Sequence, residues 1–156
     1  MSGELVEAVG ALLADYGFLV DAARYDDWLE LFSEGALYQI MPRENLDAGF
    51  EAALIYCRGK DMLRDRITSL REVNKFNLHT SRHIIGRSRI EGTTSELIAA
   101  TTPFAVYQTD QEGVSRLFAV GAYDSRLSRQ GGGLRLESQV VQLDTFSVPT
   151  LLSDPL

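Results

Sequence analysis

Two histidines lie four residues apart, at His79 and His83. On a helix this H-x-x-x-H spacing would place both rings on one face, one turn apart, where they could share a metal ion. The surrounding residues indicate a strand instead, and four residues of strand separate two side chains by about 13 Å. We therefore predict no shared metal site, with His83 hydrogen-bonded at a sheet or an interface and His79 at the surface.

The chain has one cysteine, Cys57. A single thiol cannot form an internal disulfide, and it cannot supply even the two thiolates that a Rieske iron–sulfur centre needs. This cysteine usage is typical of a reducing compartment, so we expect a cytoplasmic protein. Because Cys57 ends an apolar run, it is predicted to be a small buried side chain rather than a nucleophile.

A third group combines tyrosines, carboxylates and a histidine that could face an interior pocket. Its members are Tyr16, Asp21, Asp26, Trp28, Tyr38 and His83. A tyrosine beside a desolvated carboxylate can transfer a proton next to a carbonyl group, so Tyr16, Asp26, Tyr38 and His83 define an alternative catalytic site. The competing interpretation is structural, with Tyr16 and Trp28 in the core and Asp26 as a helix cap.

Positive charge is concentrated in residues 58–89, which hold nine Lys and Arg against three Asp and Glu, whereas the whole chain carries −7. Such asymmetry calls for a partner within or outside the fold. The pI near 4.8 argues against nucleic acid as that partner. No window approaches about eighteen uninterrupted apolar residues, and the first ten residues do not resemble a secretory signal, so no membrane association is expected.

The first half of the sequence predicts helices alternating with short strands. Residues 4–24 place apolar side chains on one helical face, and 26–32 (DDWLELF) predict a second short helix that Gly35 ends. The other expected segments are a strand at Ala36–Met41, a polar loop at Arg43–Gly49, a strand at Ala53–Cys57 and a helix at Asp61–Glu72 capped by Asp61.

The second half predicts long strands joined by turns. The strands are expected at Ile84–Ile90, Glu96–Thr109, Arg116–Ser128 and Leu134–Thr145, with a bulge near Val140, where the apolar phase changes. Gly131–Gly133 precedes a strand rather than a helix, so it is a hairpin turn and not a phosphate loop. The tail, Ser147–Leu156, is expected to lie over a surface.

This order of elements indicates one α+β domain over residues 1–156. N-terminal helices would pack in a strongly curved antiparallel sheet, forming a cone with an interior pocket. The predicted core residues are Leu12, Leu13, Tyr16, Trp28, Phe32, Phe104, Val106, Phe118 and Val120.

Several motifs together resemble the small (beta) subunit of aromatic-ring-hydroxylating dioxygenases. They are Tyr25–Phe32 (YDDWLELF), Tyr38–Leu46 (YQIMPRENL), Leu54–Tyr56 (LIY), Met62–Arg71 (MLRDRITSLR), Arg82–Gly86 (RHIIG) and the ending Asp154–Leu156 (DPL). The pair MLRDR and RHIIG at this separation is specific, and the resemblance runs nearly end to end. Among subfamilies, the sequence is most similar to those serving terephthalate, salicylate, anthranilate and benzoate.

The resemblance implies a cone-shaped fold like that of nuclear transport factor 2 and ketosteroid isomerase. It also implies a trimer of small subunits within a hexamer of three large and three small subunits. The Rieske 2Fe-2S cluster and the non-haem iron would belong to the large subunit, and this chain would hold no cofactor and be inactive alone. The enzymatic relatives of the fold keep an isomerase-like enzyme as the alternative function.

Arginines of the basic segment are candidates for ordering the subunit interfaces, because a guanidinium pairs with a carboxylate in bidentate fashion and stays charged when desolvated. The full candidate set is Arg43, Glu44, Asn45, Arg64, Arg66, Arg82, His83 and Arg87. The competing interpretation is a solvated helix face with local pairs such as Asp61–Arg64.

Overall fold

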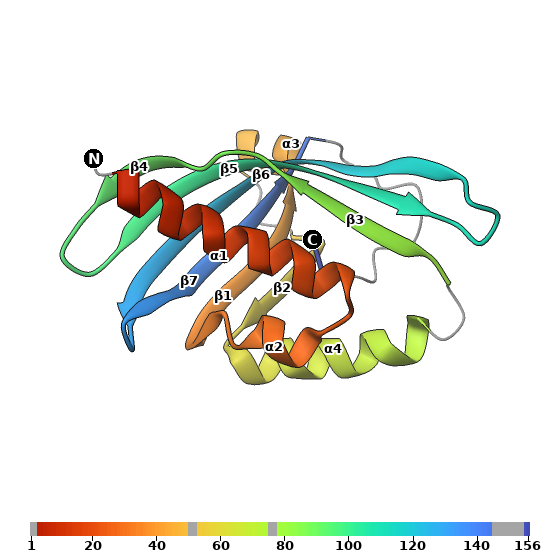
Figure 1. Cartoon of the computed structure of the whole chain (residues 1–156), viewed down its shortest axis with the longest axis horizontal. Coiled ribbons are helices and arrows are strands. Elements are labelled where there is room, and N and C mark those ends of the chain that lie inside the picture. Colours follow the sequence, from red (N-terminus) through yellow and green to blue (C-terminus); the bar gives the residue numbers. More distant parts are fainter. Residues whose placement is uncertain (1–2, 50–52, 75–77, 145–154) are drawn as a thin grey trace.

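The computed structural model describes residues 3–49, 53–74, 78–144 and 155–156. Within these residues the chain forms helices and strands in the order shown in Figure 1. The helices are α1 (Gly3–Asp21), α2 (Tyr25–Leu29), α3 (Arg43–Asp47) and α4 (Lys60–Asn74). The strands are β1 (Phe32–Pro42), β2 (Ile55–Arg58), β3 (Thr80–Ile85), β4 (Arg89–Thr93), β5 (Ile98–Thr109), β6 (Ser115–Gln130) and β7 (Gly133–Leu143).

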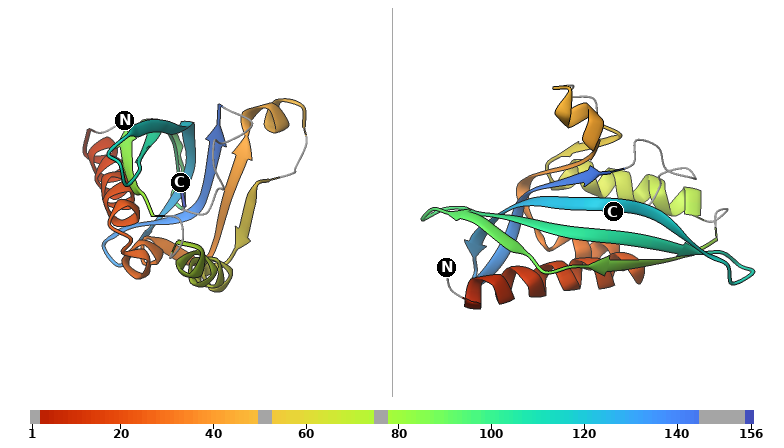
Figure 2. Two further views of the ribbon diagram at one scale, coloured as in Figure 1. Left: turned by 90° about the vertical axis from the view of Figure 1, so that its right-hand side faces the viewer. Right: turned by 90° about the horizontal axis from the view of Figure 1, so that it is seen from above.

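One curved sheet carries the fold. Its strand order is β2-β1-β7-β6-β5-β3, and β4 also pairs with β5. Figure 2 shows the sheet wrapping around α1, while α4 packs beside β1 and β2. The expected α+β cone is confirmed. Its strands pair antiparallel with one exception, because β1 and β7 run parallel and join the first half of the chain to the end of the meander.

Some boundaries differ from the sequence-based prediction. The second helix ends at Leu29, and Phe32 already pairs with Leu136 in the sheet, so Gly35 lies within β1 rather than ending a helix. The Arg43–Gly49 segment is not a loop, since Arg43–Asp47 forms α3 directly after Pro42, whose fixed φ suits the position before a helix.

The expected strand over 84–90 is interrupted. β3 ends at Ile85 and β4 begins at Arg89, although both pair with β5. Gly86 lies so close to Pro103 of β5 that a Cβ at position 86 would come within 2.8 Å of the proline ring. Pro103 has no N–H to offer to the ladder, which explains why regular pairing is lost here.

Two bulges set which side chains face the core. The pairs Val106–Ala119 and Tyr107–Leu117 leave Phe118 as an extra residue, so Phe118 and Ala119 both point inward and Val120 is only half-buried. The other eight predicted core residues are buried. The phase change in β7 is also real, but the shift between Arg126 and Leu127 places the extra residue at Glu137 rather than near Val140.

Aromatic rings fill the middle of the cone. Tyr16 makes edge contacts with Trp28 and Tyr123, at centroid distances of 5.6 and 5.4 Å. Trp28 contacts Tyr38 at 5.6 Å, and Phe104 stacks on Tyr123 at 4.3 Å. These contacts join α1, α2 and strands β1, β5 and β6 in one core. None of the helices described has the length and apolar character needed to cross a membrane.

A close approach of two strands predicts the effect of one substitution. A Cβ on Gly121 of β6 would lie 1.8 Å from the Gln142 carbonyl oxygen of β7. We expect Gly121→Ala to lower the free energy of unfolding by about 3 kcal/mol, the upper end of the usual overpacking cost, because backbone must move. Gly10→Ala is the matched control, because a Cβ at Gly10 in helix α1 would meet no atom within 4 Å. This variant should have a free energy of unfolding about 0.5–1 kcal/mol higher than the parent chain. Urea unfolding of both variants measures the difference, and equal midpoints would contradict the strand spacing.

Candidate functional site

The tyrosines of the predicted pocket meet inside the cone, where they bind the main chain of Leu156. The Tyr16 hydroxyl donates to the main-chain oxygen of Leu156 at 2.5 Å, and the Tyr38 hydroxyl donates to the same oxygen at 3.0 Å. The Leu156 N–H in turn donates to the Tyr38 hydroxyl at 2.9 Å. Leu156 is 1% exposed, so this residue lies in the core and not over a surface as expected. Residues 147–154 of the predicted tail lie outside the described residues.

The Tyr16 and Tyr38 hydroxyls act as hydrogen-bond donors. Burial raises the pKa of Tyr16 and Tyr38 well above the ordinary tyrosine value, so both are protonated at neutral pH. Within the ranges that the structure describes, no Asp or Glu side chain hydrogen-bonds to either hydroxyl. The pair can therefore hold a carbonyl oxygen, but it has no neighbouring base to accept its proton.

His83 is paired with a carboxylate from α1. Its ring Nδ1 lies 2.7 Å from Oδ1 of Asp21, and its backbone N–H donates to Oδ2 at 2.8 Å. Both side chains are buried, with 1% of His83 and 7% of Asp21 exposed. The two hydrogen bonds hold strand β3 against the end of helix α1, and His83 is hydrogen-bonded as predicted.

The residues of the alternative acid–base site are not all together. Tyr16 and Tyr38 meet at Leu156, and His83 is held by Asp21. Asp26 is 83% exposed and lies 3.5 Å from Arg71 of α4. It does not cap its helix either, since the N-cap is Arg24 and no side chain caps the first turn.

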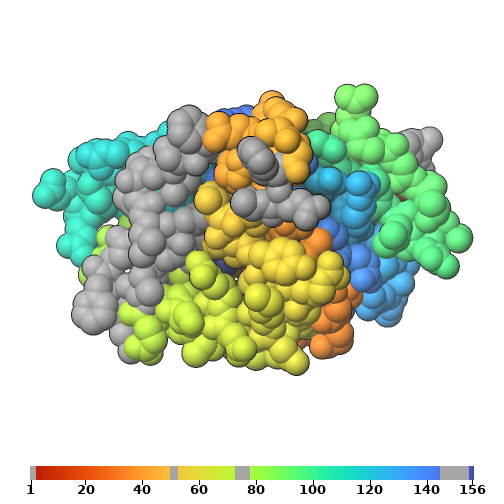
Figure 3. Space-filling model, turned by 180° about the vertical axis from the view of Figure 1, so that it is seen from behind, coloured from red at the N-terminus to blue at the C-terminus, as the bar shows by residue number. Residues whose placement is uncertain are grey.

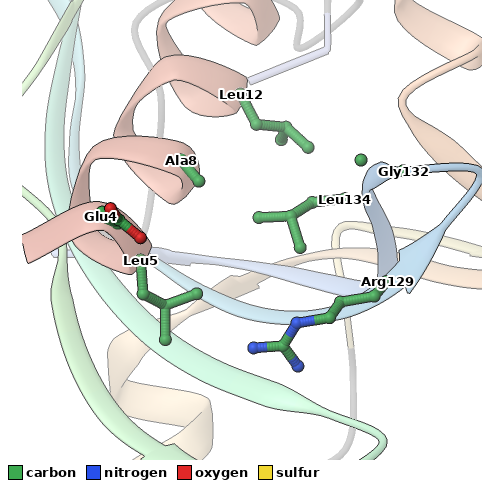
Figure 4. Close-up of a pocket in the computed structure, with 8 residues that line it drawn as sticks. Glu4, Leu5, Ala8, Leu12, Arg129, Gly132 and Leu134 are labelled. Atoms are coloured by element: carbon green, nitrogen blue, oxygen red, sulfur yellow. The ribbon is translucent and has the colours of Figure 1, made fainter. Parts of the chain in front are cut away.

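A separate hollow lies between the first half of α1 and the β6–β7 turn. It has a volume of about 540 Å³, and Figure 4 shows Leu5, Leu12 and Leu134 projecting into it. Its charged side chains are Glu4 and Arg129. The hollow contains none of the predicted catalytic residues.

A smaller hollow of about 260 Å³ lies between α1 and β3, beside the Asp21–His83 pair. Phe18 and Ile84 line it and are 68% and 55% exposed. Arg82, on the same strand, is also exposed and forms no ion pair with a residue in the part of the chain described. The surface between α1 and β3 is therefore apolar and carries a guanidinium that forms no ion pair within the described residues.

The other interface candidates lie mostly at the surface. Figure 3 shows a face on which both α3 and α4 are exposed, at opposite ends of the view. In α3, Arg43 pairs with Asp144 at 3.1 Å, and Glu44 is exposed while Asn45 is half-buried. In α4, Arg64 pairs with Asp61 at 2.8 Å, the local pair considered above, and Asp61 lies in the first turn rather than before it. Arg66 and Arg87 are exposed.

Cys57 is 2% exposed, and burial raises the pKa of its thiol, as expected of a structural cysteine. Among the described residues, no three His, Cys, Asp or Glu side chains are grouped to hold a metal ion.

Sequence reasoning missed two partners. The first is Leu156, and the only signal for it is that the tail contains an apolar residue after Pro155. The second is the pairing of Asp21 with His83, whose side chains are 62 residues apart. Asp21 was a pocket candidate, but no local spacing connects it with the histidine.

Comparisons with known proteins agree with this geometry. The family described as ring hydroxylating beta subunit matches residues 18–150. The small subunit of anthranilate 1,2-dioxygenase from Burkholderia cepacia is 35% identical over 88% of this chain and 85% of its own length. The beta 2 subunit of the terminal oxygenase component of terephthalate 1,2-dioxygenase from a Comamonas species is 31% identical over 95% of this chain and 96% of its own.

A solved structure is similar over the same span. It is assigned as the beta subunit of an aromatic-ring-hydroxylating dioxygenase from Novosphingobium aromaticivorans, with a TM-score of 0.89, 37% identity, and 97% of both chains covered. The cone is thus of the type shared with nuclear transport factor 2, as the resemblance implied. The chain belongs to the family of beta subunits of ring-hydroxylating dioxygenases.

Proposed function

We propose that this chain is the structural small subunit of a dioxygenase that hydroxylates an aromatic acid, in the catabolism of aromatic compounds. The observation that carries the proposal is the similarity to a terephthalate dioxygenase beta subunit over 95% of this chain and 96% of the relative. The partner is a large subunit that holds the Rieske 2Fe-2S cluster and the mononuclear iron, in a cytoplasmic assembly of three large and three small subunits. The whole chain, 1–156, acts as one domain in it.

The interior geometry supports a partner role over an isomerase-like enzyme. The buried tyrosines are occupied by Leu156, and Asp26 lies on the surface. A catalytic cone would need an open cavity with a carboxylate poised near the substrate. Neither condition is met at Tyr16 and Tyr38, so nothing here favours the enzyme alternative.

The outer face of the sheet offers a surface for a partner. Arg82 of β3 lies opposite Tyr107 of β5, which lies opposite Leu117 of β6. With Ile84 they form an outer-face band, in which Ile84, Tyr107 and Leu117 are 55%, 43% and 48% exposed. An apolar band of this kind fits a subunit interface, because it lies next to a guanidinium that has no ion pair in the part of the chain that the structure describes.

Within this proposal, the interface candidates take different parts. Arg82 would pair with a carboxylate of a neighbouring subunit, and Arg87 lies two residues beyond the end of its strand. His83 would act as a positioning residue, because its bonds to Asp21 fix the strand that carries Arg82 and Ile84. Arg66 has no ion pair within the described ranges, whereas Arg43 and Arg64 would exchange their present carboxylates for a partner's. Glu44 and Asn45 would contribute through the surface of α3.

The assembly is tested by co-expressing the chain with its large subunit. Native mass spectrometry should give three copies of each subunit, and the chain alone should give a trimer. Iron and the visible absorbance of the cluster should follow the large subunit. Monomeric small subunit together with an active large subunit free of it would contradict the proposal.

Removal of the Arg82 guanidinium tests the outer-face band. If a partner's carboxylate is left buried and unpaired, Arg82→Ala should weaken assembly by about 2–5 kcal/mol, or roughly 30-fold or more. Folding of the isolated chain should be nearly unchanged, because the side chain is exposed there. Arg24→Ala is the control, since Arg24 is exposed and pairs locally with Asp27. Dilution series by mass photometry compare the variants, and identical dissociation of both would exclude an interface role for Arg82.

A further inference from the structure

The hairpin between β5 and β6 ends in a turn that its own hydrogen bonds hold in one shape. Oδ1 of Asp110 accepts the N–H groups of Glu112 and Val114 at 2.9 and 3.0 Å, and the Asp110 N–H donates to the Val114 carbonyl at 3.0 Å. At the tip, Val114 is 42% exposed, and Glu112 is exposed and forms no ion pair with a described residue. The turn therefore presents an apolar side chain and a carboxylate in a fixed arrangement.

The hollow between α1 and β3 has the complementary features. Its volume of about 260 Å³ exceeds the roughly 150 Å³ of a cavity that holds a benzene ring. Phe18 and Ile84 line it and are exposed, so an apolar side chain would be favourable there. Asp21 and His83 also line the hollow but bind each other, whereas Arg82 is exposed and has no ion pair in the described ranges.

The hairpin tip cannot reach the hollow of its own chain. Thr80, the first residue of β3, pairs with Thr109, the last residue of β5. From this pair the hollow-lining residues of β3 continue in one direction, and the turn at 110–114 continues in the other. Figures 1 and 2 show the hairpin extending outward at this end of the sheet. Two different patches on one chain that fit each other make a head-to-tail contact, which can close into a ring.

We propose that the tip of the β5–β6 hairpin of one small subunit docks into the α1–β3 hollow of a second copy of this chain. Val114 enters beside Phe18 and Ile84, and Glu112 pairs with Arg82. The preformed turn lowers the entropic cost of this contact. The inference rests on the proposed function, because it names the contact that builds the small-subunit trimer and makes the neighbour of Arg82 a small subunit rather than the large one.

Exchange of the two charges is the first test, made on the chain alone. Arg82→Glu and Glu112→Arg each bring like charges together across the contact, so each should weaken trimer formation about tenfold or more. The double variant restores opposite charges and should recover most of the affinity. Glu96→Arg is the control, because Glu96 is exposed in the turn at the other end of β5. Sedimentation equilibrium over a dilution series measures all four variants.

Filling the hollow is a second test that leaves the hairpin unchanged. Ala14 of α1 is exposed and lines the hollow, so Ala14→Trp should weaken trimer formation about tenfold or more while the melting temperature of the monomer stays nearly unchanged. Ala11→Trp is the matched control, since Ala11 is an exposed residue of the same helix outside the lining of the hollow. An Ala14→Trp trimer as stable as that of the parent chain would contradict the docking.

Crosslinking in the complex with the large subunit identifies the neighbour. The chain with Ile84→Cys and Val114→Cys is treated with a short bismaleimide, and its native Cys57 is buried. Peptide mass spectrometry should find position 84 joined to position 114 of another small subunit, and each single-cysteine variant should lack this product.

The inference is overturned if neither charge reversal weakens the trimer, if the double variant is as weak as the single variants, or if positions 84 and 114 link only to the large subunit. A hexamer that forms normally in any of these cases leaves the proposed function standing. Conversely, a chain that never binds a large subunit contradicts the proposed function, while recovery of its trimer by the double variant still supports the hairpin contact.

Discussion

The phenolic hydroxyls of Tyr16 and Tyr38 are buried in the centre of the cone, and a buried polar group left without a partner costs about 1–3 kcal/mol. Leu156 removes that cost, since its main-chain oxygen accepts hydrogen bonds from both hydroxyls and its N–H donates to the Tyr38 hydroxyl. The same residue fills apolar volume between the helices and the sheet. Leu156 therefore satisfies these two hydroxyls and completes the apolar core around them.

A second constraint fixes the opposite side of the cone. Asp21 ends α1 and accepts two hydrogen bonds from His83, so edge strand β3 is held against the helix. Side chains alternate along β3, and His83 faces inward while Arg82 and Ile84 face outward. The buried Asp21–His83 pair thus fixes the position of Arg82 and Ile84 on the outer face. Loss of the Asp21 side chain would therefore disturb the outer face, although Asp21 is not part of it.

The sequence predicts most of the fold because the signals involved are local. Apolar periodicity finds α1 and α4, and turn residues such as Gly131 separate the long strands. The errors occur where sheet pairing overrides local preference. Phe32 joins a strand because Leu136 is available to pair with it. The predicted strand over 84–90 is interrupted because Gly86 lies against Pro103 of the neighbouring strand β5. Val120 turns outward because of a bulge at Phe118, which alternation alone does not locate.

The site is harder to predict than the fold, because its contacts join residues far apart in the chain. The candidate residues Tyr16, Tyr38 and His83 are buried in the interior. Their partners are 140, 118 and 62 residues away, so no spacing in the sequence reveals them. Asp26 has a carboxylate that could serve in a pocket, yet it lies on the exposed face of the five-residue helix α2.

A cone of this kind can serve as an enzyme or as a subunit, and the fold alone does not decide which. Two features of this chain act in the same direction. Inside, neutral tyrosines hold a residue of the chain itself, and no Asp or Glu side chain in the described structure hydrogen-bonds to them. Outside, Ile84, Tyr107 and Leu117 leave apolar area exposed on a sheet face next to Arg82, where burial against another subunit would be favourable. The two tyrosine hydroxyls that a catalytic cone could present to a substrate are therefore occupied by the chain itself, and the exposed apolar band is a surface that a partner subunit would cover.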